Sequence, residues 1–130
     1  MHRVNYKPLS MNEAFMGRKR KTAKYRDYEM KVPKELPELD LPSRGPLGLR
    51  LRAGLSNRAA DLDNVVKPFL DILQSHYGFN DNRIYIIEMT KVKVPKTEEY
   101  IAFELYPLDE EPSDIGDCIF IPEDDNEDDS

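Results

Sequence analysis

Two aspartates, Asp61 and Asp63, precede an apolar stretch of this chain, and their spacing suggests chemistry. They are two positions apart, so in extended backbone both side chains leave the same face. Neighbouring carboxylates repel each other, and a hard divalent cation such as Mg²⁺ relieves that repulsion while it keeps several water ligands. Lys67 lies four residues after Asp63, so in a helix that begins near Asp63 its ammonium would point back toward the acids. Carboxylates, a metal ion and a lysine suit phosphodiester hydrolysis, in which negative charge develops on phosphate oxygens.

The same residues also have a purely structural interpretation. Asp63 is a good N-cap for a helix, and apolar side chains follow it at the spacing of one helical face, at Val66, Phe69, Leu70 and Leu73. On this interpretation Asp61 is a turn residue and Lys67 is a solvated charge. The D-x-D spacing is common, so spacing alone leaves both interpretations open.

A third acid, Asp81, follows the predicted helix. It lies in the stretch from Gly78 to Arg83, which is typical of a loop, and the strand-forming residues Ile84–Ile87 come next. A helix that returns alongside its own starting strand would bring Asp81 to the acid pair. Taken alone, Asp81 is equally well explained as a turn former.

The stretch from Arg58 to Lys93 resembles the RusA family of Holliday junction resolvases, which are often encoded by phages. The matching residues are Asp61-Leu62-Asp63-Asn64, Lys67, Asp71-Ile72-Leu73, Asp81 and Ile84. Near the N-terminus, Pro8-Leu9-Ser10-Met11-Asn12 is similar to the early P-x-S-x-N element of that family. The resemblance covers residues 6–106.

The resemblance implies a metal-dependent nuclease. In the family three aspartates bind a divalent metal and a lysine is essential, which implies a metal site at Asp61, Asp63 and Asp81 and a catalytic role for these residues and Lys67. Mg²⁺ is the expected cofactor, with Mn²⁺ as the alternative. The implied activity is resolution of four-way DNA junctions by a homodimer, in DNA recombination and repair. The chain departs from the family at Asn80-Asp81, where two adjacent acids are usual, and at Pro68 directly after the lysine.

Pro68 constrains the helix that follows the acid pair. A proline inside a helix removes one backbone hydrogen bond and crowds the carbonyl four residues earlier, here that of Asn64. We expect the helix to start at Val65 or later, near Pro68. The alternative is a distorted first turn, which would free the Asn64 carbonyl beside the proposed metal.

Composition limits the other possibilities. A chain of 130 residues suits one domain with a sizeable core. The single cysteine, Cys118, excludes an internal disulfide, and the two histidines, His2 and His76, are too scattered for a histidine metal site. No apolar run approaches a membrane span and the N-terminus lacks a signal-peptide pattern, so we expect a cytoplasmic protein, in the host cytoplasm if a phage encodes it.

The net charge of −6 hides two segments of opposite sign. From Leu108 onward there are eleven acids and no lysine or arginine, whereas the first 34 residues hold ten bases and three acids. We therefore expect a nuclease domain over residues 1–108 and a flexible acidic tail over 109–130. Within the tail, the apolar run Cys118-Ile119-Phe120-Ile121 suggests an added strand or a docking segment.

The basic residues are candidates for contacts with DNA phosphates. With Asn12 of the early element, the predicted DNA-binding residues are Arg18, Lys19, Arg20, Lys21, Lys24, Arg50, Arg52 and Arg58. A solvated basic loop explains the N-terminal charges equally well. Tyr25 and Tyr28 lie three apart, and we expect them on one helical face against the core.

The pattern predicts a mixed α/β domain with a small sheet and two main helices. One helix is expected over residues 22–32, and the other follows the acid pair and runs to about His76. Leucines alternate with Gly48, Arg50 and Arg52 from Leu47 to Leu51, which indicates a half-buried strand with a basic outer face. Residues 84–94 and 99–106 are expected to pair as a hairpin around Pro95-Lys96-Thr97.

Two further functions remain open on the sequence. The first is a nuclease for other branched DNA, such as flaps or forks, which would use the same residues. The second is a non-catalytic module that binds nucleic acid or a partner through the basic residues and does not need the acids to hold a metal.

Overall fold

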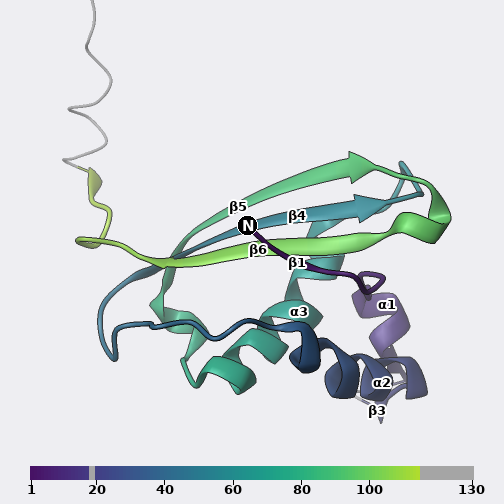
Figure 1. Ribbon diagram of the computed structural model, residues 1–130, viewed down its shortest axis with the longest axis horizontal. Helices are drawn as coiled ribbons and strands as arrows, with labels where there is room; N and C mark the ends of the chain where they lie inside the picture. The colour runs from purple at the N-terminus through teal and green to yellow at the C-terminus, as the bar shows by residue number, and fades with distance from the viewer. Residues whose placement is uncertain (18–19, 115–130) are drawn as a thin grey trace, which may run out of the picture.

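A computed structural model describes residues 1–17 and 20–114 of the chain as a mixed α/β domain (Figure 1). Its strands are β1 (His2–Val4), β2 (Phe15–Met16), β3 (Arg20–Lys21), β4 (Leu47–Leu55), β5 (Ile84–Lys93) and β6 (Tyr100–Pro107). Its α-helices are α1 (Met11–Ala14), α2 (Ala23–Lys31) and α3 (Leu62–Tyr77). Three short 3-10 helices complete it: η1 (Val32–Glu35), η2 (Asp81–Arg83) and η3 (Lys96–Glu98). The predicted small sheet and two main helices, α2 and α3, are confirmed.

The main sheet has the strand order β1-β6-β4-β5. β4 pairs in parallel with β5 and antiparallel with β6, so the sheet is mixed. Parallel neighbours need a crossover connection, and α3 is the helix of this β-α-β unit. The three α-helices lie on one side of the sheet, and the other side is uncovered in Figure 1.

The predicted hairpin of residues 84–94 with 99–106 is wrong. The two segments do form strands, but β4 lies between them and pairs with both. The error arises because β4 is fully buried along one face and needs partners on both sides, which outweighs the local preference of sequential strands to pair. The Pro95–Glu99 connection therefore passes across the end of β4, where the Val94 amide donates to the Leu55 carbonyl at 3.0 Å.

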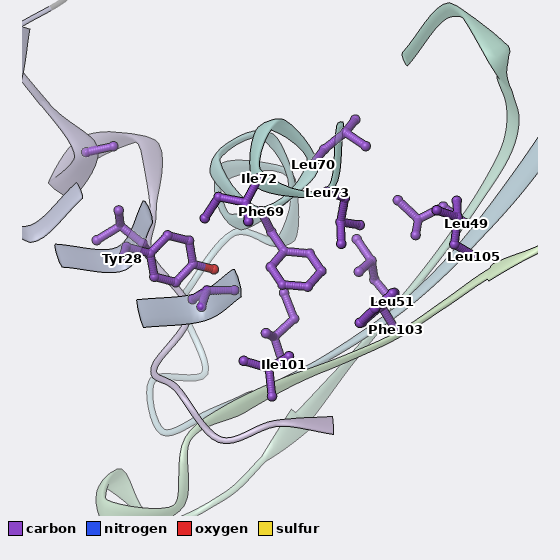
Figure 2. Packing of buried hydrophobic residues seen from close by; sticks show 14 of the residues in the cluster. Tyr28, Leu49, Leu51, Phe69, Leu70, Ile72, Leu73, Ile101, Phe103 and Leu105 are labelled. Carbon is purple, nitrogen blue, oxygen red and sulfur yellow. The ribbon is translucent and has the colours of Figure 1, made fainter. Parts of the chain in front are cut away.

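The core lies between α3 and the sheet (Figure 2). The alternating leucines of β4, Leu47, Leu49 and Leu51, are 0–3% exposed, as predicted from their spacing. Phe69 of α3 meets Phe103 of β6 edge to face, with ring centroids 5.5 Å apart. Tyr25 and Tyr28 of α2 are buried, so their predicted place in the core is confirmed.

Two glycines let tyrosines lie flat on the uncovered side of β4. The Tyr106 ring covers Gly48 and the Tyr100 ring covers Gly54, so closely that a Cβ at either glycine would overlap the ring. Arg3 stacks on Tyr100, with its guanidinium carbon 3.9 Å from the ring centroid. The two rings can therefore pack against this side of the sheet only because β4 has glycine at these two positions.

α3 begins earlier than predicted. Its N-cap is Asp61 and its first residue is Leu62, so Pro68 lies inside the helix and the expectation of a start at Val65 or later is wrong. Pro68 is tolerated because its ring is less than 2% exposed and fills the core, which compensates for the lost hydrogen bond. Since Pro68 has no N–H, the Asn64 carbonyl lacks the hydrogen bond that a helix would normally supply.

The two N-terminal helices, α1 and α2, each begin with a side-chain N-cap. Ser10 and Glu13 form a capping box at α1, and Thr22 caps α2 through the Tyr25 amide. The Thr22 hydroxyl also donates to the Glu13 carbonyl at 2.6 Å, which joins the start of α2 to α1.

The last strand of the described chain ends close to residue 108, where the predicted tail begins, and the division into a domain and a tail stays a prediction. β6 ends at Pro107, and residues 108–114 continue as irregular chain. The greater part of the predicted tail, including the apolar run at 118–121, lies outside the described residues. No helix in the described part of the chain is long and apolar enough to cross a membrane.

Candidate functional site

A cavity of about 380 Å³ opens at the carboxyl end of β4. In open α/β sheets this is the end at which ligands usually bind, because the loops that follow the strands diverge there. Its walls come from the β1–α1 connection and α1, from the loop after β4 with the start of α3, and from Glu99. Its polar and charged lining residues are Lys7, Ser10, Asn12, Glu13, Ser56, Asn57, Asp61, Asn64 and Glu99.

The cavity joins two sequence elements that are about fifty residues apart. Pro8, Ser10 and Asn12 of the early element line it together with Asp61 and Asn64 of the acid-pair element. α1 is held in place by its own capping box, which leaves Asn12 exposed at the rim. The structure therefore brings together residues that the sequence could only assign separately.

Glu13 carries negative charge into this cavity. Burial opposes ionisation, but hydrogen bonding from the Ser10 amide and the ammoniums of Lys24 and Lys7 outweigh it and lower the pKa of Glu13. Lys24 Nζ lies 3.4 Å from the Glu13 carboxylate. Lys24, predicted to bind DNA, thus lies beside the cavity and is partly neutralised by Glu13.

The loop from Ser56 to Ala60, which leads into Asp61, is held by the two neighbouring chain segments. The Glu99 carboxylate accepts hydrogen bonds from the amide and the hydroxyl of Ser56, both at 2.8 Å. From β5, Lys91 Nζ donates to the carbonyls of Arg58 at 2.6 Å and Ala60 at 2.9 Å. Sequence reasoning missed Lys91 and Glu99, because each binds the backbone of a loop more than thirty residues away and such contacts leave no local pattern.

The two aspartates of the pair do not share one face of an extended segment. Asp61 is extended, with φ −87° and ψ 127°, whereas Asp63 already lies in the first turn of α3. Helical spacing groups Asp61 with Asn64 and Val65, which line the cavity. The same spacing groups Asp63 with Lys67 and Asp71 on a neighbouring stripe of the helix.

Lys67 points away from the acid pair. Its Nζ lies 2.7 Å from the carboxylate of Asp71, and this hydrogen bond is the main cause of the raised pKa of Lys67. The prediction that its ammonium turns back toward Asp61 and Asp63 is wrong for this conformation. The Lys67 side chain is 52% exposed, so the ion pair with Asp71 is a surface pair that costs little to break.

Asp71 belongs to the matched motif, where it has no predicted role, and in the structure it accepts several hydrogen bonds. Besides Lys67, its carboxylate accepts hydrogen bonds from Gln74 Nε2 and from the Tyr25 hydroxyl, each at 3.4 Å. Gln74 in turn accepts a hydrogen bond from the Asp81 amide at 2.8 Å. A polar chain thus runs along α3 from Lys67 to Asp81.

Asp81 lies at the opposite end of α3 from the acid pair. Its amide donates to Gln74 in the last turns of the sixteen-residue helix, and its charge contributes to the raised pKa of Lys67. The next residues lie beside the start of β4, where Arg83 donates to the carbonyls of Gly45 at 2.9 Å and Pro42 at 2.8 Å. In the described part of the chain Asp61, Asp63 and Asp81 do not gather into one group that could hold a metal ion, so the expectation that the returning helix brings Asp81 to the acid pair is wrong for this conformation.

The predicted DNA-binding residues lie on different surfaces. Arg50 is on the uncovered side of the sheet between Glu88 and Glu104, which neutralise its charge, so its predicted use as a free phosphate contact is not supported. Arg52 is exposed on the same strand, and Arg58 is exposed in the loop before Asp61. Arg20 and Lys21 form β3, with Lys21 paired to Glu29 at 2.8 Å, and Arg18 and Lys19 lie outside the described residues.

The residues present allow a partial fit to Mg²⁺. Among residues 1–17 and 20–114, no three acidic, histidine or cysteine side chains are grouped so that they could hold a metal ion. Mg²⁺ needs only one or two carboxylates when water supplies its other ligands, and Asp61 and Asp63 are both exposed at the start of α3. The donor set of one chain thus suits a hydrated ion, without Asp81.

Comparisons with known proteins add no further assignment. Neither the scan against protein-family models nor the search of curated proteins gives a match to this chain.

Proposed function

We propose that this protein is a metal-dependent endonuclease of the RusA type that resolves Holliday junctions as a homodimer. The observation that carries the proposal is the cavity at the carboxyl end of β4. It is lined by Pro8, Ser10 and Asn12 of the early element and by Asp61 and Asn64 of the acid-pair element, two of the sequence elements on which the resemblance rests.

The roles follow from position and charge. Asp61 and Asp63 would hold Mg²⁺, which when bound supplies an activated water and polarises the scissile phosphate. Lys67 has one weak surface partner and can swing toward the phosphate to stabilise charge on its oxygens. Lys91 and Glu99 keep the loop before Asp61 in one conformation, so the carboxylate is positioned in advance.

Asp81 fits this proposal only if it comes from a second copy. Within one chain it lies beside Gln74 of α3, and in the described residues it does not form a three-carboxylate group with Asp61 and Asp63. A two-fold dimer could bring Asp81 of one protomer to Asp61 and Asp63 of the other, and would form two equivalent sites. Two such sites suit a four-way junction, in which two symmetry-related strands must be cut.

The first experiment compares substrates. A synthetic four-way junction, a flap, a fork and plain duplex are incubated with the protein and Mg²⁺ or Mn²⁺. We expect paired cuts in the junction and little cutting of duplex. Cleavage of flaps or forks in preference to the junction would replace junction resolution with the broader branched-DNA activity.

The second experiment tests the acids. Asp61→Asn, Asp63→Asn and Asp81→Asn should each lower the cleavage rate by about 100-fold or more, with junction binding retained because binding depends mainly on basic residues. Asp40→Asn is the control, because Asp40 is exposed in the connection before β4. If any of the three variants cleaves at the wild-type rate, the aspartate replaced in that variant is not part of the catalytic site.

The third experiment asks whether Asp81 acts across the dimer. Asp61→Asn and Asp81→Asn proteins, each inactive alone, are mixed and allowed to exchange subunits. If Asp81 acts across the interface, each mixed dimer has one intact site, and the mixture should recover about a quarter of wild-type cleavage. An inactive mixture in which mixed dimers are detected would place both acids in the site of one chain.

One observation favours a second candidate, a non-catalytic module that binds branched nucleic acid. In the described part of one chain, the acids do not gather into a three-carboxylate group, and Lys67 is paired with Asp71. Tight junction binding without cleavage in either metal would support this candidate.

A further inference from the structure

β5 forms an open edge of the main sheet. It has ten residues and pairs with β4 on one side, and no strand of the described part of the chain pairs with its other side. Tyr85 and Ile87 are each 47% exposed on this strand. A long edge with exposed apolar side chains invites another strand, and proteins normally cover or charge such an edge.

The chain returns to this edge after β6. The Leu108 amide donates to the carbonyl of Pro46 at 2.9 Å, directly before the start of β4, and Leu47 of β4 pairs with Ile84 of β5. Glu111 then reaches the Tyr85 hydroxyl by a hydrogen bond, and its charge raises the pKa of Tyr85. The segment that follows therefore leaves from the amino end of β5.

The following residues have the composition that this edge requires. The apolar run Ile119-Phe120-Ile121 comes first, and six acids follow it at 123, 124, 125, 127, 128 and 129. The carboxyl end of β5 has the opposite charge: Lys91 and Lys93 line a depression of about 260 Å³ together with Arg58. A segment that runs along β5 in the strand's own direction would meet the apolar part of the edge before the basic part.

The length of the chain permits this path. β5 has ten residues and so spans about 30 Å. Residues 115–130 are sixteen more residues, which extend to at most about 55 Å. The apolar run can therefore lie beside Tyr85 and Ile87 while the acids reach Lys93 and Arg58.

We propose that residues 118–121 dock as a parallel strand on the open edge of β5, which directs the acids at 123–129 onto Arg58 and Lys93. The occupant of the edge is thus the protein's own C-terminal segment. The docked segment covers the apolar edge, and its charges cover a basic surface directly before Asp61. DNA that approaches this end of the sheet has to displace it.

Amide hydrogen exchange of the full-length protein, followed by NMR, tests the docking directly. On β5, alternate amides point away from β4, and these should exchange slowly in the wild type. In a full-length variant with Ile119→Ser, Phe120→Ser and Ile121→Ser, the same amides should exchange about tenfold or more faster. Amides of β5 that point toward β4 should keep their wild-type rates in both proteins, which controls for the fold.

Two further measurements separate the possible occupants. A peptide of residues 115–130 added to a chain that ends at Asp114 should restore protection of the outward-pointing amides. Equal, rapid exchange in the wild type and the triple variant would overturn the proposal. Protection that persists in the triple variant and increases with protein concentration would also overturn it, because a second copy of the chain would then occupy the edge.

Discussion

Lys67 is the residue whose role depends most on what surrounds it. In the structure its ammonium is paired with Asp71, and Asp71 is itself part of a polar chain that leads to Asp81. The arrangement keeps Lys67 charged and ordered on the surface of α3, one helical turn after Asp63. A small side-chain rotation would exchange one anionic partner, the Asp71 carboxylate, for another, a DNA phosphate.

This role predicts different effects for two substitutions. Lys67→Ala should lower the cleavage rate by about 100-fold while junction affinity changes far less, since the charge acts in the transition state. Asp71→Asn removes the competing carboxylate and keeps the lysine, so cleavage should be retained. Single-turnover rates and binding isotherms measure both effects. Equal losses of rate and affinity in Lys67→Ala would identify Lys67 as a phosphate contact only.

A second residue-scale prediction concerns pH. The hydrogen bond from Tyr6 to Asp27 raises the pKa of Tyr6 to about 12. It also lowers the pKa of Asp27, with help from Lys31. The folded state therefore holds the Tyr6 proton between its ordinary pKa of 10.0 and about 12, and stability falls as pH rises through that range. For Asp27 the contribution is present above the ordinary pKa of 3.8 and is lost as pH falls below it.

Tyr6→Phe should therefore be less stable than the wild type at pH 7, and this difference should shrink both above pH 10 and in acid. Urea unfolding of the two proteins across the pH range measures it. Because other tyrosines also titrate at high pH, the informative quantity is the difference between the two proteins. A constant difference from neutral to alkaline pH would contradict the assigned bond.

At the scale of elements, the candidate site depends on one loop. The loop Ser56–Ala60 connects β4 to α3. Glu99, which precedes β6, accepts hydrogen bonds from Ser56 at the start of the loop. Lys91 of β5 donates to two carbonyls in its second half. The backbone groups of this loop would otherwise be free to rearrange, and Asp61 would move with them. The loop is thus the link between the mixed sheet order and the position of the acid.

Removing the hydrogen bonds of either Lys91 or Glu99 to this loop should lower the affinity of the site for metal without unfolding the domain. We expect Lys91→Met and Glu99→Gln each to lower metal affinity and cleavage rate by about 10- to 100-fold, the range typical of residues that orient a ligand. Lys96→Met and Glu98→Gln are matched controls on neighbouring exposed positions. Metal titration of cleavage gives the affinity, and circular dichroism checks the fold. Unchanged metal dependence in both variants would show that the loop holds Asp61 without them.

For the whole molecule, the distribution of charge matters more than its sum. The net charge is −6, yet seven of the acids lie in residues 115–130, where there are no lysines or arginines. Ending the chain after Asp114 therefore changes the formal charge from −6 to +1. If this acidic segment lies on the basic surface of the domain, it would compete there with DNA at high effective concentration, because it is tethered to the same chain.

The truncated protein should bind plain duplex more tightly than the full chain. The gain should be greatest at low salt and should fade as salt rises, because at 0.1 M exposed charges are screened over about 10 Å. Junction-over-duplex preference should fall at the same time. Fluorescence anisotropy across a salt series measures this, with a full-length control in which the acids of 123–129 are replaced by their amides. If the truncated protein and the full chain bind duplex with the same affinity at every salt concentration, the tail has no influence on DNA binding.

The sequence by itself determined the features that depend on local spacing. The alternating leucines of β4 and the i, i+3 tyrosines of α2 predicted which side chains are buried, because burial of a periodic apolar face follows from element geometry alone. It also identified Asp61, Asn64 and Asn12 as residues of interest, since their motifs are contiguous in the chain.

The tertiary structure decided what depends on contacts between distant segments. Only the strand order shows that β4 separates β5 from β6, and only the contact of Asp81 with Gln74 near the end of α3 shows that Asp81 lies apart from the acid pair of its own chain. Burial of the Pro68 ring overrode the local rule that a proline begins a helix, because core packing outweighs one backbone hydrogen bond. Lys91 and Glu99 bind the backbone of a remote loop, so their role follows from the sheet that brings them there, and no spacing in the sequence specifies it.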